Sequence, residues 1–174
     1  MKGVTVWFTG LPCSGKTTIA NKLADILKNR GFRVERLDGD IIREELTSDL
    51  GFSRKDRDEN IKRVTFVAKL LTRNDVIVLA TFISPYRERR NKSRKEIDDF
   101  LEVYVKCPVE ECIKRDVKGM YKKALEGKIK GFTGIDDPYE EPIEPDLILE
   151  TNKEKVEESV DKVLLLLKKT GYIP

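Results

Sequence analysis

Apolar residues follow two alternating patterns along the chain. Short continuous runs rich in β-branched and aromatic residues lie at 4–9, 32–37, 76–80, 100–105 and 147–149, and such runs predict strands that are buried on both faces. Between them, apolar residues recur every three or four positions, which predicts helices over about 15–30, 40–46, 53–71 and 156–167, with two more after Pro85 and Pro108. Strands that alternate with helices predict an α/β fold with a parallel sheet covered on both faces.

Several local signals predict where the helices begin. Ser53, with Asp56 three residues later, predicts a capping box, and Pro108 is expected at the first helical position. Thr151 or Asn152 is the expected cap of the last helix.

Residues 117–145 contain four Gly and three Pro and show no long period, as is typical of a lid or binding loop. The chain has no internal repeat and no boundary in composition. We therefore predict a single domain over 1–174 with a lid at about 117–140.

Charge and hydropathy argue against several classes of protein. The 174 residues hold 34 Lys and Arg against 31 Asp and Glu, a balance that argues against a general nucleic-acid-binding protein. No apolar stretch reaches 18 residues, so we expect no membrane span. The first residues lead directly into a strand, unlike a signal peptide, and we expect a cytoplasmic protein.

Residue types that are absent or rare exclude several kinds of catalytic and metal site. The chain has no His, which excludes His-based triads and His metal sites. Cys13, Cys107 and Cys112 are odd in number and lack a second metal-binding pair, so we expect free, partly buried thiols. A surface rich in Lys, Arg and Glu without any Gln resembles the composition of thermophile proteins.

The segment after the first strand carries the most specific motif. Gly10-Leu11-Pro12-Cys13-Ser14-Gly15-Lys16-Thr17 fits G-x-x-x-x-G-K-[ST], a loop whose backbone N–H groups cradle phosphates at the start of a helix. We predict that this loop and Thr18 bind ATP. The Lys16 side chain should reach the β- and γ-phosphates, and the Thr17 hydroxyl should ligate Mg²⁺.

The rest of the sequence argues against a switch GTPase, although such proteins also carry a phosphate loop. The nearest match to its N-K-x-D guanine reader is Asn152-Lys153-Glu154-Lys155, which has Lys where Asp is needed. No D-x-x-G follows a middle strand either. A small-molecule kinase is the favoured alternative.

The second strand ends in two carboxylates, Asp38 and Asp40. In an open α/β sheet the carboxyl ends of the strands face the ligand, so these groups can hold the Mg²⁺ water shell and accept a hydrogen bond from an attacking hydroxyl. A plain turn with an Asp cap is the simpler alternative. Planar guanidinium groups and an amide that suit phosphate or sulfate oxygens follow at Arg43, Arg54, Arg57, Asn60 and Arg63.

Two loop phenylalanines, Phe52 and Phe132, lie beside glycines and could hold a flat base between them. The basic run at 87–95 could steer anions or contact RNA, but we expect a solvated helix face.

Together these segments resemble the adenylyl-sulfate kinase family, which phosphorylates the 3′-hydroxyl of adenosine 5′-phosphosulfate. The matching segments span nearly the whole chain in order: the phosphate loop, Leu37-Asp38-Gly39-Asp40, Leu50-Gly51-Phe52-Ser53, Asp56-Arg57-x-Glu59-Asn60-Ile61, Ile83-Ser84-Pro85-Tyr86-Arg87, Arg115-Asp116-x-Lys118-Gly119 and residues 131–140, which read GFTGIDDPYE.

The resemblance implies a role for each matched residue. Asp40 faces the acceptor hydroxyl as base or orienting group. Arg43, Arg57 and Asn60 hold the phosphosulfate, and Phe52 and Phe132 sandwich the acceptor adenine. Lys118 lies by the transferred phosphate, with Asp38 on the acceptor side and Arg115 near the donor nucleotide.

The resemblance also implies a phosphoserine role for Ser84. Phosphoryl transfer by phosphate-loop kinases needs positioning and charge neutralisation rather than a covalent step, so we expect Ser84 and Ile83 to line the acceptor pocket. Val117 and Leu125 stand where the family often has Pro and Arg, and the second change implies one fewer lid contact to the nucleotide.

Two other functions stay open on the residues alone. One is a kinase for a nucleoside or sugar acid, and the other is a non-catalytic nucleotide-binding module. The resemblance further implies a homodimer and a functional link to a sulfate adenylyltransferase. The apolar last helix could serve either the core or the subunit interface.

Overall fold

The computed structural model describes residues 2–174, so Met1 of the predicted domain lies outside the described residues. The strands are β1 (Val4–Thr9), β2 (Val34–Asp38), β3 (Ile77–Thr81), β4 (Phe100–Lys106) and β5 (Leu147–Glu150). The helices are α1 (Lys16–Asn29), α2 (Gly39–Glu44), α3 (Arg54–Thr72), α4 (Arg87–Glu96), α5 (Val109–Arg115), α6 (Met120–Leu125) and α7 (Val156–Lys169).

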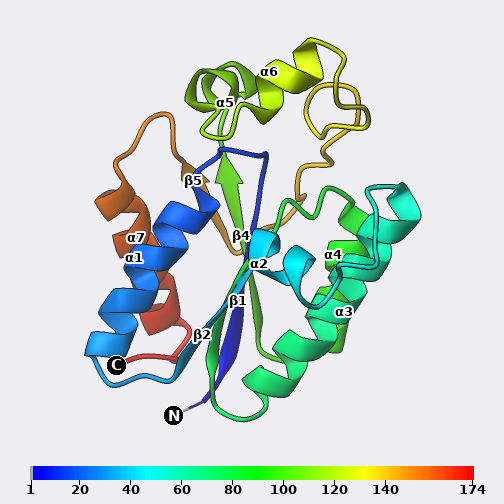
Figure 1. Ribbon diagram of the computed structural model, residues 1–174. Coiled ribbons are helices and arrows are strands. Elements are labelled where there is room, and N and C mark those ends of the chain that lie inside the picture. The colour runs from blue at the N-terminus through cyan, green and yellow to red at the C-terminus, as the bar shows by residue number, and fades with distance from the viewer. Residues whose placement is uncertain (1) are drawn as a thin grey trace.

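The strands form one parallel sheet in the order β2-β3-β1-β4-β5, which confirms the predicted fold class. β1 lies at the centre, where Val6 pairs with Leu79 on one side and Leu101 on the other. Helices α1 and α7 cover one face and α3 and α4 cover the other (Figure 1). The loops that follow the strands therefore meet at one edge of the sheet, below α5 and α6.

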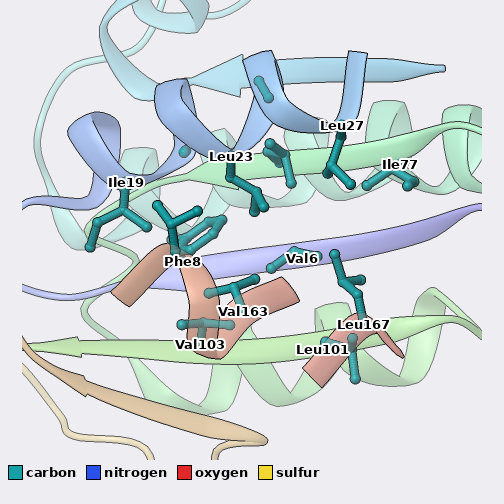
Figure 2. Packing of buried hydrophobic residues seen from close by; sticks show 14 of the residues in the cluster. Val6, Phe8, Ile19, Leu23, Leu27, Ile77, Leu101, Val103, Val163 and Leu167 are labelled. Atoms are coloured by element: carbon teal, nitrogen blue, oxygen red, sulfur yellow. The ribbon is translucent and has the colours of Figure 1, made fainter. Parts of the chain in front are cut away.

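The larger core lies between the sheet and the α1–α7 pair (Figure 2). Figure 2 shows Ile19 of α1 beside Phe8 and Leu27 of α1 beside Ile77, and Val163 and Leu167 of α7 complete the layer. Each such side chain, when fully buried, contributes about 1.5–3 kcal/mol. Val160, Val163 and Leu167 of α7 thus belong to the core.

The opposite face of the sheet holds an aromatic cluster. The indole of Trp7 is fully buried and stacks on Phe82 at 5.5 Å and on Phe100 at 5.9 Å between ring centroids. Ile61 and Val64 of α3 pack against the same cluster. Both faces are therefore apolar, as the continuous runs in the strands predicted.

Of the three residues predicted to mark helix starts, Ser53 is confirmed, whereas the positions assigned to Pro108 and to the cap of the last helix are wrong. The Ser53 hydroxyl accepts the Asp56 N–H at 3.1 Å at the start of α3. Pro108 immediately precedes α5 as its N-cap rather than occupying its first turn. The cap of α7 is Lys155, whose N–H is bound by the Glu158 carboxylate at 2.6 Å, because residues 151–154 form a turn instead.

The expectation of a solvated face for the basic run is wrong for two of its arginines. Arg89 and Arg90 are 6% and 1% exposed and lie on the inner side of α4. Each is paired with an acid, Glu96 for Arg89 and Glu102 for Arg90. Buried arginines need such partners, and Glu102 lies on β4, so the partner of Arg90 cannot be identified from the local run of charges.

The segment at 117–140, hereafter the lid segment, contains α6 and is otherwise irregular. It lies with α5 above the carboxyl edge of the sheet (Figure 1). Among the described residues, no helix combines the length and apolar character that a membrane crossing requires.

Candidate active site

The phosphate loop connects the centre of the sheet to α1. A Cβ on Gly10 would lie 2.4 Å from the Val105 carbonyl oxygen, so only glycine fits against β4. Gly15 has φ +106°, a conformation that also favours glycine. These two positions let the loop curl directly from β1 into the first turn of α1.

Lys16 lies inside this curl. Its ammonium group donates to the carbonyl oxygens of Gly10 at 2.8 Å and Leu11 at 2.7 Å. Burial lowers the pKa of Lys16 to about 8, against an ordinary value of 10.5. The loop thus holds a buried cation where the sequence predicted contact with phosphates.

The remaining loop residues differ in exposure. Ser14 is buried, Leu11, Pro12 and Cys13 are half-buried, and Thr17 and Thr18 are exposed at the start of α1. Cys107 and Cys112 are buried beneath the loop. All three cysteines carry free thiols.

Asp38 joins the end of β2 to the phosphate loop. Its Oδ2 atom accepts hydrogen bonds from the hydroxyls of Thr17 at 3.0 Å and Thr81 at 3.1 Å, and pairs with Arg36 at 3.0 Å. Its Oδ1 atom accepts the Asp40 N–H at 3.1 Å, which caps α2.

These contacts set the charge of Asp38. Burial raises the pKa of its carboxyl, but the hydrogen bonds and the neighbouring guanidinium outweigh burial and hold the pKa below its ordinary value of 3.8. Asp38 is therefore a carboxylate at neutral pH. Arg36 and Thr81 were missed by the sequence analysis, because nothing in the local pattern shows that they converge on Asp38.

Asp40, in the first turn of α2, is exposed, as expected of a group that meets a substrate. Its carboxylate is paired with Lys118 of the lid segment. That hydrogen bond raises the pKa of Lys118. The structure thus brings together two residues that the sequence assigned to one reaction.

Arg43 and Phe52 lie together at one side of the site. The Arg43 guanidinium donates to the Gly51 carbonyl at 2.7 Å and lies 4.7 Å from the centroid of the Phe52 ring. That ring is 71% exposed. An exposed aromatic ring held by a cation is available for stacking on a ligand.

Arg57 and Asn60 of α3 have partners within the chain. Arg57 donates to Asp137 and the Thr133 hydroxyl, both at 2.8 Å, and so joins α3 to the lid segment. Asn60 is buried and its Oδ1 accepts the Thr47 hydroxyl at 2.7 Å. The other two arginines predicted nearby lie elsewhere: Arg63 pairs with Asp49 and Glu59, and Arg54 lies over the Tyr86 ring.

Ser84 lies in the loop after β3, next to the half-buried Ile83. The Ser84 hydroxyl is buried; it accepts the Trp7 indole N–H at 3.1 Å and donates to the Thr9 hydroxyl at 3.1 Å. Its partners are therefore structural groups rather than a base. Its φ of +41° is unusual for a residue with a side chain.

Phe132 and Arg115 lie near the phosphate loop. The half-buried Phe132 ring meets the Tyr121 ring edge-on at 5.0 Å. Arg115, at the end of α5, donates to the carbonyl oxygens of Thr151 at 2.7 Å and Ser14 at 3.3 Å. Arg115 thus supports the backbone of the phosphate loop.

Comparison with known proteins agrees with this geometry. The profile of the family described as Adenylylsulphate kinase matches residues 2–150. Over 172 residues, the adenylyl-sulfate kinase of Halothermothrix orenii is 60% identical, covering 99% of this chain and 93% of the relative. That of Picosynechococcus sp. is 58% identical, covering 99% and 97%.

A solved structure gives the same result. The Mycobacterium tuberculosis APS kinase CysC, solved in complex with AMPPNP and APS, superposes with a TM-score of 0.93 at 44% identity. The match covers 96% of this chain and 98% of that protein. On this evidence the chain belongs to the adenylyl-sulfate kinase family of phosphotransferases.

Proposed function

We propose that the chain transfers the γ-phosphoryl group of ATP to the 3′-hydroxyl of adenosine 5′-phosphosulfate. The observation that carries this proposal is the hydrogen bond between Thr17 of the phosphate loop and Asp38, two residues before Asp40. It joins the donor site after β1 to the acceptor site after β2. A phosphate loop next to an exposed carboxylate is the arrangement that transfer to a hydroxyl requires.

On the donor side, the backbone N–H groups of the loop and the Lys16 ammonium neutralise charge on the phosphates. An oxygen donor set of one hydroxyl, Thr17, and one ionised carboxylate, Asp38, fits Mg²⁺, which prefers oxygen ligands and keeps several waters. Mg²⁺ would be held by Thr17 directly and by Asp38 through water. When bound, it shields the charge on the β- and γ-phosphates.

On the acceptor side, Asp40 accepts the proton of the attacking hydroxyl. Its exposure leaves it accessible, and its pairing with Lys118 shows that a cation reaches the same point. With substrate present, Lys118 passes from Asp40 to the transferred phosphoryl group, where positive charge is needed.

The acceptor has an adenine ring at one end and an anionic phosphosulfate at the other, and different residues recognise the two parts. Phe52 and Phe132 take the two faces of the adenine, and Arg43, Arg57 and Asn60 hold the phosphosulfate. Ile83 and Ser84 line the pocket, since the buried Ser84 hydroxyl is already committed to Trp7 and Thr9. Closure of the lid segment over both substrates excludes water.

Three wider expectations complete the proposal. The chain acts as a homodimer in the cytoplasm, and a sulfate adenylyltransferase supplies its acceptor. The likeness to relatives named adenylyl-sulfate kinase supports them. Light scattering of the purified chain tests the oligomer.

A coupled assay for ADP tests the reaction. With ATP, Mg²⁺ and adenosine 5′-phosphosulfate we expect steady ADP release, and a product with one further phosphate by mass. Nucleosides, gluconate and shikimate serve as control acceptors. Equal turnover with a control acceptor, or ATP binding without any ADP, contradicts the proposal.

A further inference from the structure

Arg90 of α4 is the most deeply buried charged side chain among the described residues, at 1% exposure. Each arm of its guanidinium group has a separate partner. Nη1 donates to the Ser84 carbonyl oxygen at 2.6 Å, Nη2 to the Glu140 carbonyl oxygen at 2.5 Å, and Nε to the Glu102 carboxylate at 2.9 Å. One rigid fork thus joins three segments that lie far apart in the sequence.

Two of these segments belong to the acceptor side. Ser84 lies in the loop at 82–86, and Glu140 ends the lid segment. A second bond joins the same two segments, since the Glu140 N–H donates to the Pro85 carbonyl at 2.9 Å. Arg90 therefore contacts both the fixed wall of the proposed acceptor pocket and the base of its moving cover.

The backbone at Ser84 needs such support. A φ of +41° is costly for a residue with a side chain, and it persists where surrounding contacts hold it. The Arg90 bond holds the Ser84 carbonyl, and Trp7 and Thr9 hold its hydroxyl.

Tyr139 links Arg90 to the phosphate-loop strand. Its ring centroid lies 5.6 Å from the guanidinium carbon of Arg90, and its hydroxyl shares a hydrogen bond of 2.8 Å with Thr9, the last residue of β1. Thr9 in turn donates to the Ile83 carbonyl at 2.8 Å. The polar contacts around Arg90 thus connect the end of the lid segment, the loop at 82–86 and β1 to one another.

We propose that Arg90 is a positioning residue for the acceptor: it fixes the loop at 82–86 against the base of the lid segment without touching substrate. The inference rests on the proposed function, because it concerns the acceptor pocket of that reaction. The positive charge of Arg90 is not enough for this role, because the geometry of the guanidinium group also matters. A lysine carries its three donors on one nitrogen at the end of a flexible stem, so it cannot reproduce the planar fork whose three separate nitrogens reach these three partners.

The substitution Arg90→Lys tests this directly, with Arg94→Lys as its matched control. Arg94 lies on the same helix and pairs with the same Glu102, at 3.5 Å, and with Asp146, but it contacts neither the acceptor loop nor the lid segment in the bonds described. We expect Arg90→Lys to raise KM for adenosine 5′-phosphosulfate by about tenfold, since small misplacements at a pocket are costly. KM for ATP should stay within about twofold of the parent in both variants.

The sole tryptophan supplies an independent signal, because the Trp7 indole is bonded to Ser84. Arg90→Lys should shift the Trp7 emission and Arg94→Lys should not. Tyr139→Phe, which removes one hydroxyl and keeps the ring, should raise KM for the acceptor in the same direction. If Arg90→Lys does not fold, the acceptor KM of Tyr139→Phe tests the positioning role instead.

The outcomes separate cleanly. Equal changes in both KM values, or equal effects of Arg90→Lys and Arg94→Lys, would overturn the inference and leave the proposed function standing. Absence of acceptor-dependent turnover in the parent chain would overturn the proposed function itself. A selective rise in the acceptor KM, with unchanged ATP binding by calorimetry, supports the positioning role.

Discussion

The ammonium group of Lys118 pairs with the carboxylate of Asp40 across 78 positions of sequence. The first residue belongs to the lid segment and the second to the turn that follows β2. The proposed base of the reaction and a cation needed for phosphoryl transfer are therefore neighbours in space.

Substituting Asp40 by Ala should lower kcat by about 10²-fold or more, because general-base catalysis typically contributes that much. ATP binding should stay near normal, since Lys16 and the loop backbone are untouched. Steady-state kinetics and calorimetry with ATP measure the two effects. Glu44→Ala, at the other end of α2, is the control and should turn over normally; unchanged kcat in Asp40→Ala would refute the role of the carboxylate.

Substituting Phe52 by Ala should raise KM for the acceptor by about tenfold or more, because stacking of a base on an aromatic ring contributes about 1–3 kcal/mol. Thermal stability should hardly change, since the ring is 71% exposed. Phe66→Ala on α3 is the matched control, with a ring that is 61% exposed. If both variants bind the acceptor equally well, Phe52 does not stack on it.

Substituting Asp38 by Asn should lower the free energy of unfolding by about 3 kcal/mol at neutral pH, as removal of one partner of a buried ion pair does. The pKa of Asp38 is held below 3.8 in the folded chain, so its contribution is present above that pH and is lost on acidification below it. The difference between parent and variant should therefore shrink in acid. Urea unfolding at several pH values checks this, with the exposed Glu35→Gln of the same strand as control; a difference that persists in acid contradicts it.

ATP binding should be coupled to proton uptake by Lys16. Its pKa of about 8 means that the free chain increasingly holds a neutral amine above that pH, whereas the phosphates of ATP favour the ammonium form. The affinity for ATP should thus fall as pH rises through about 8. Calorimetry near that pH in buffers of different ionisation enthalpy measures the uptake, and Lys16→Arg, which stays charged, should abolish it.

The same pKa has a consequence for stability that carries the opposite sign. Between about 8 and 10.5 the unfolded chain binds a proton at Lys16 that the folded chain has lost. The contribution of this residue to folding therefore becomes more favourable as pH rises through that window. Lys16→Met should remove this part of the pH dependence, and an unchanged slope would contradict the assignment.

Features of the structure that depend on residues adjacent in the sequence could be predicted from the sequence alone. The strands, the Ser53 cap and the phosphate loop are each predicted from a few adjacent residues; the cap is confirmed, and every strand begins and ends within two residues of its predicted bounds. Asp38 and Asp40 were found for the same reason, because they mark the carboxyl end of a strand.

Contacts between distant segments could not be predicted. The burial of Arg90 depends on Glu102, on the next strand, so the local run of charges indicated a solvated face. Arg57 is joined to Asp137 of the lid segment, a contact that spacing on α3 does not show. The N-cap of α7 is Lys155 rather than Thr151, whose hydroxyl instead donates to the Ser14 carbonyl oxygen at 2.7 Å.

The lid segment also rests directly on the phosphate loop. The Tyr121 hydroxyl donates to the Pro12 carbonyl at 3.0 Å, and a Cβ on Gly134 would come within 3.0 Å of the Leu11 side chain. We expect the lid segment to open at these contacts when a nucleotide leaves the phosphate loop. We therefore expect each catalytic cycle to be paced by escape of ADP, so that a faster chemical step alone would not quicken the enzyme.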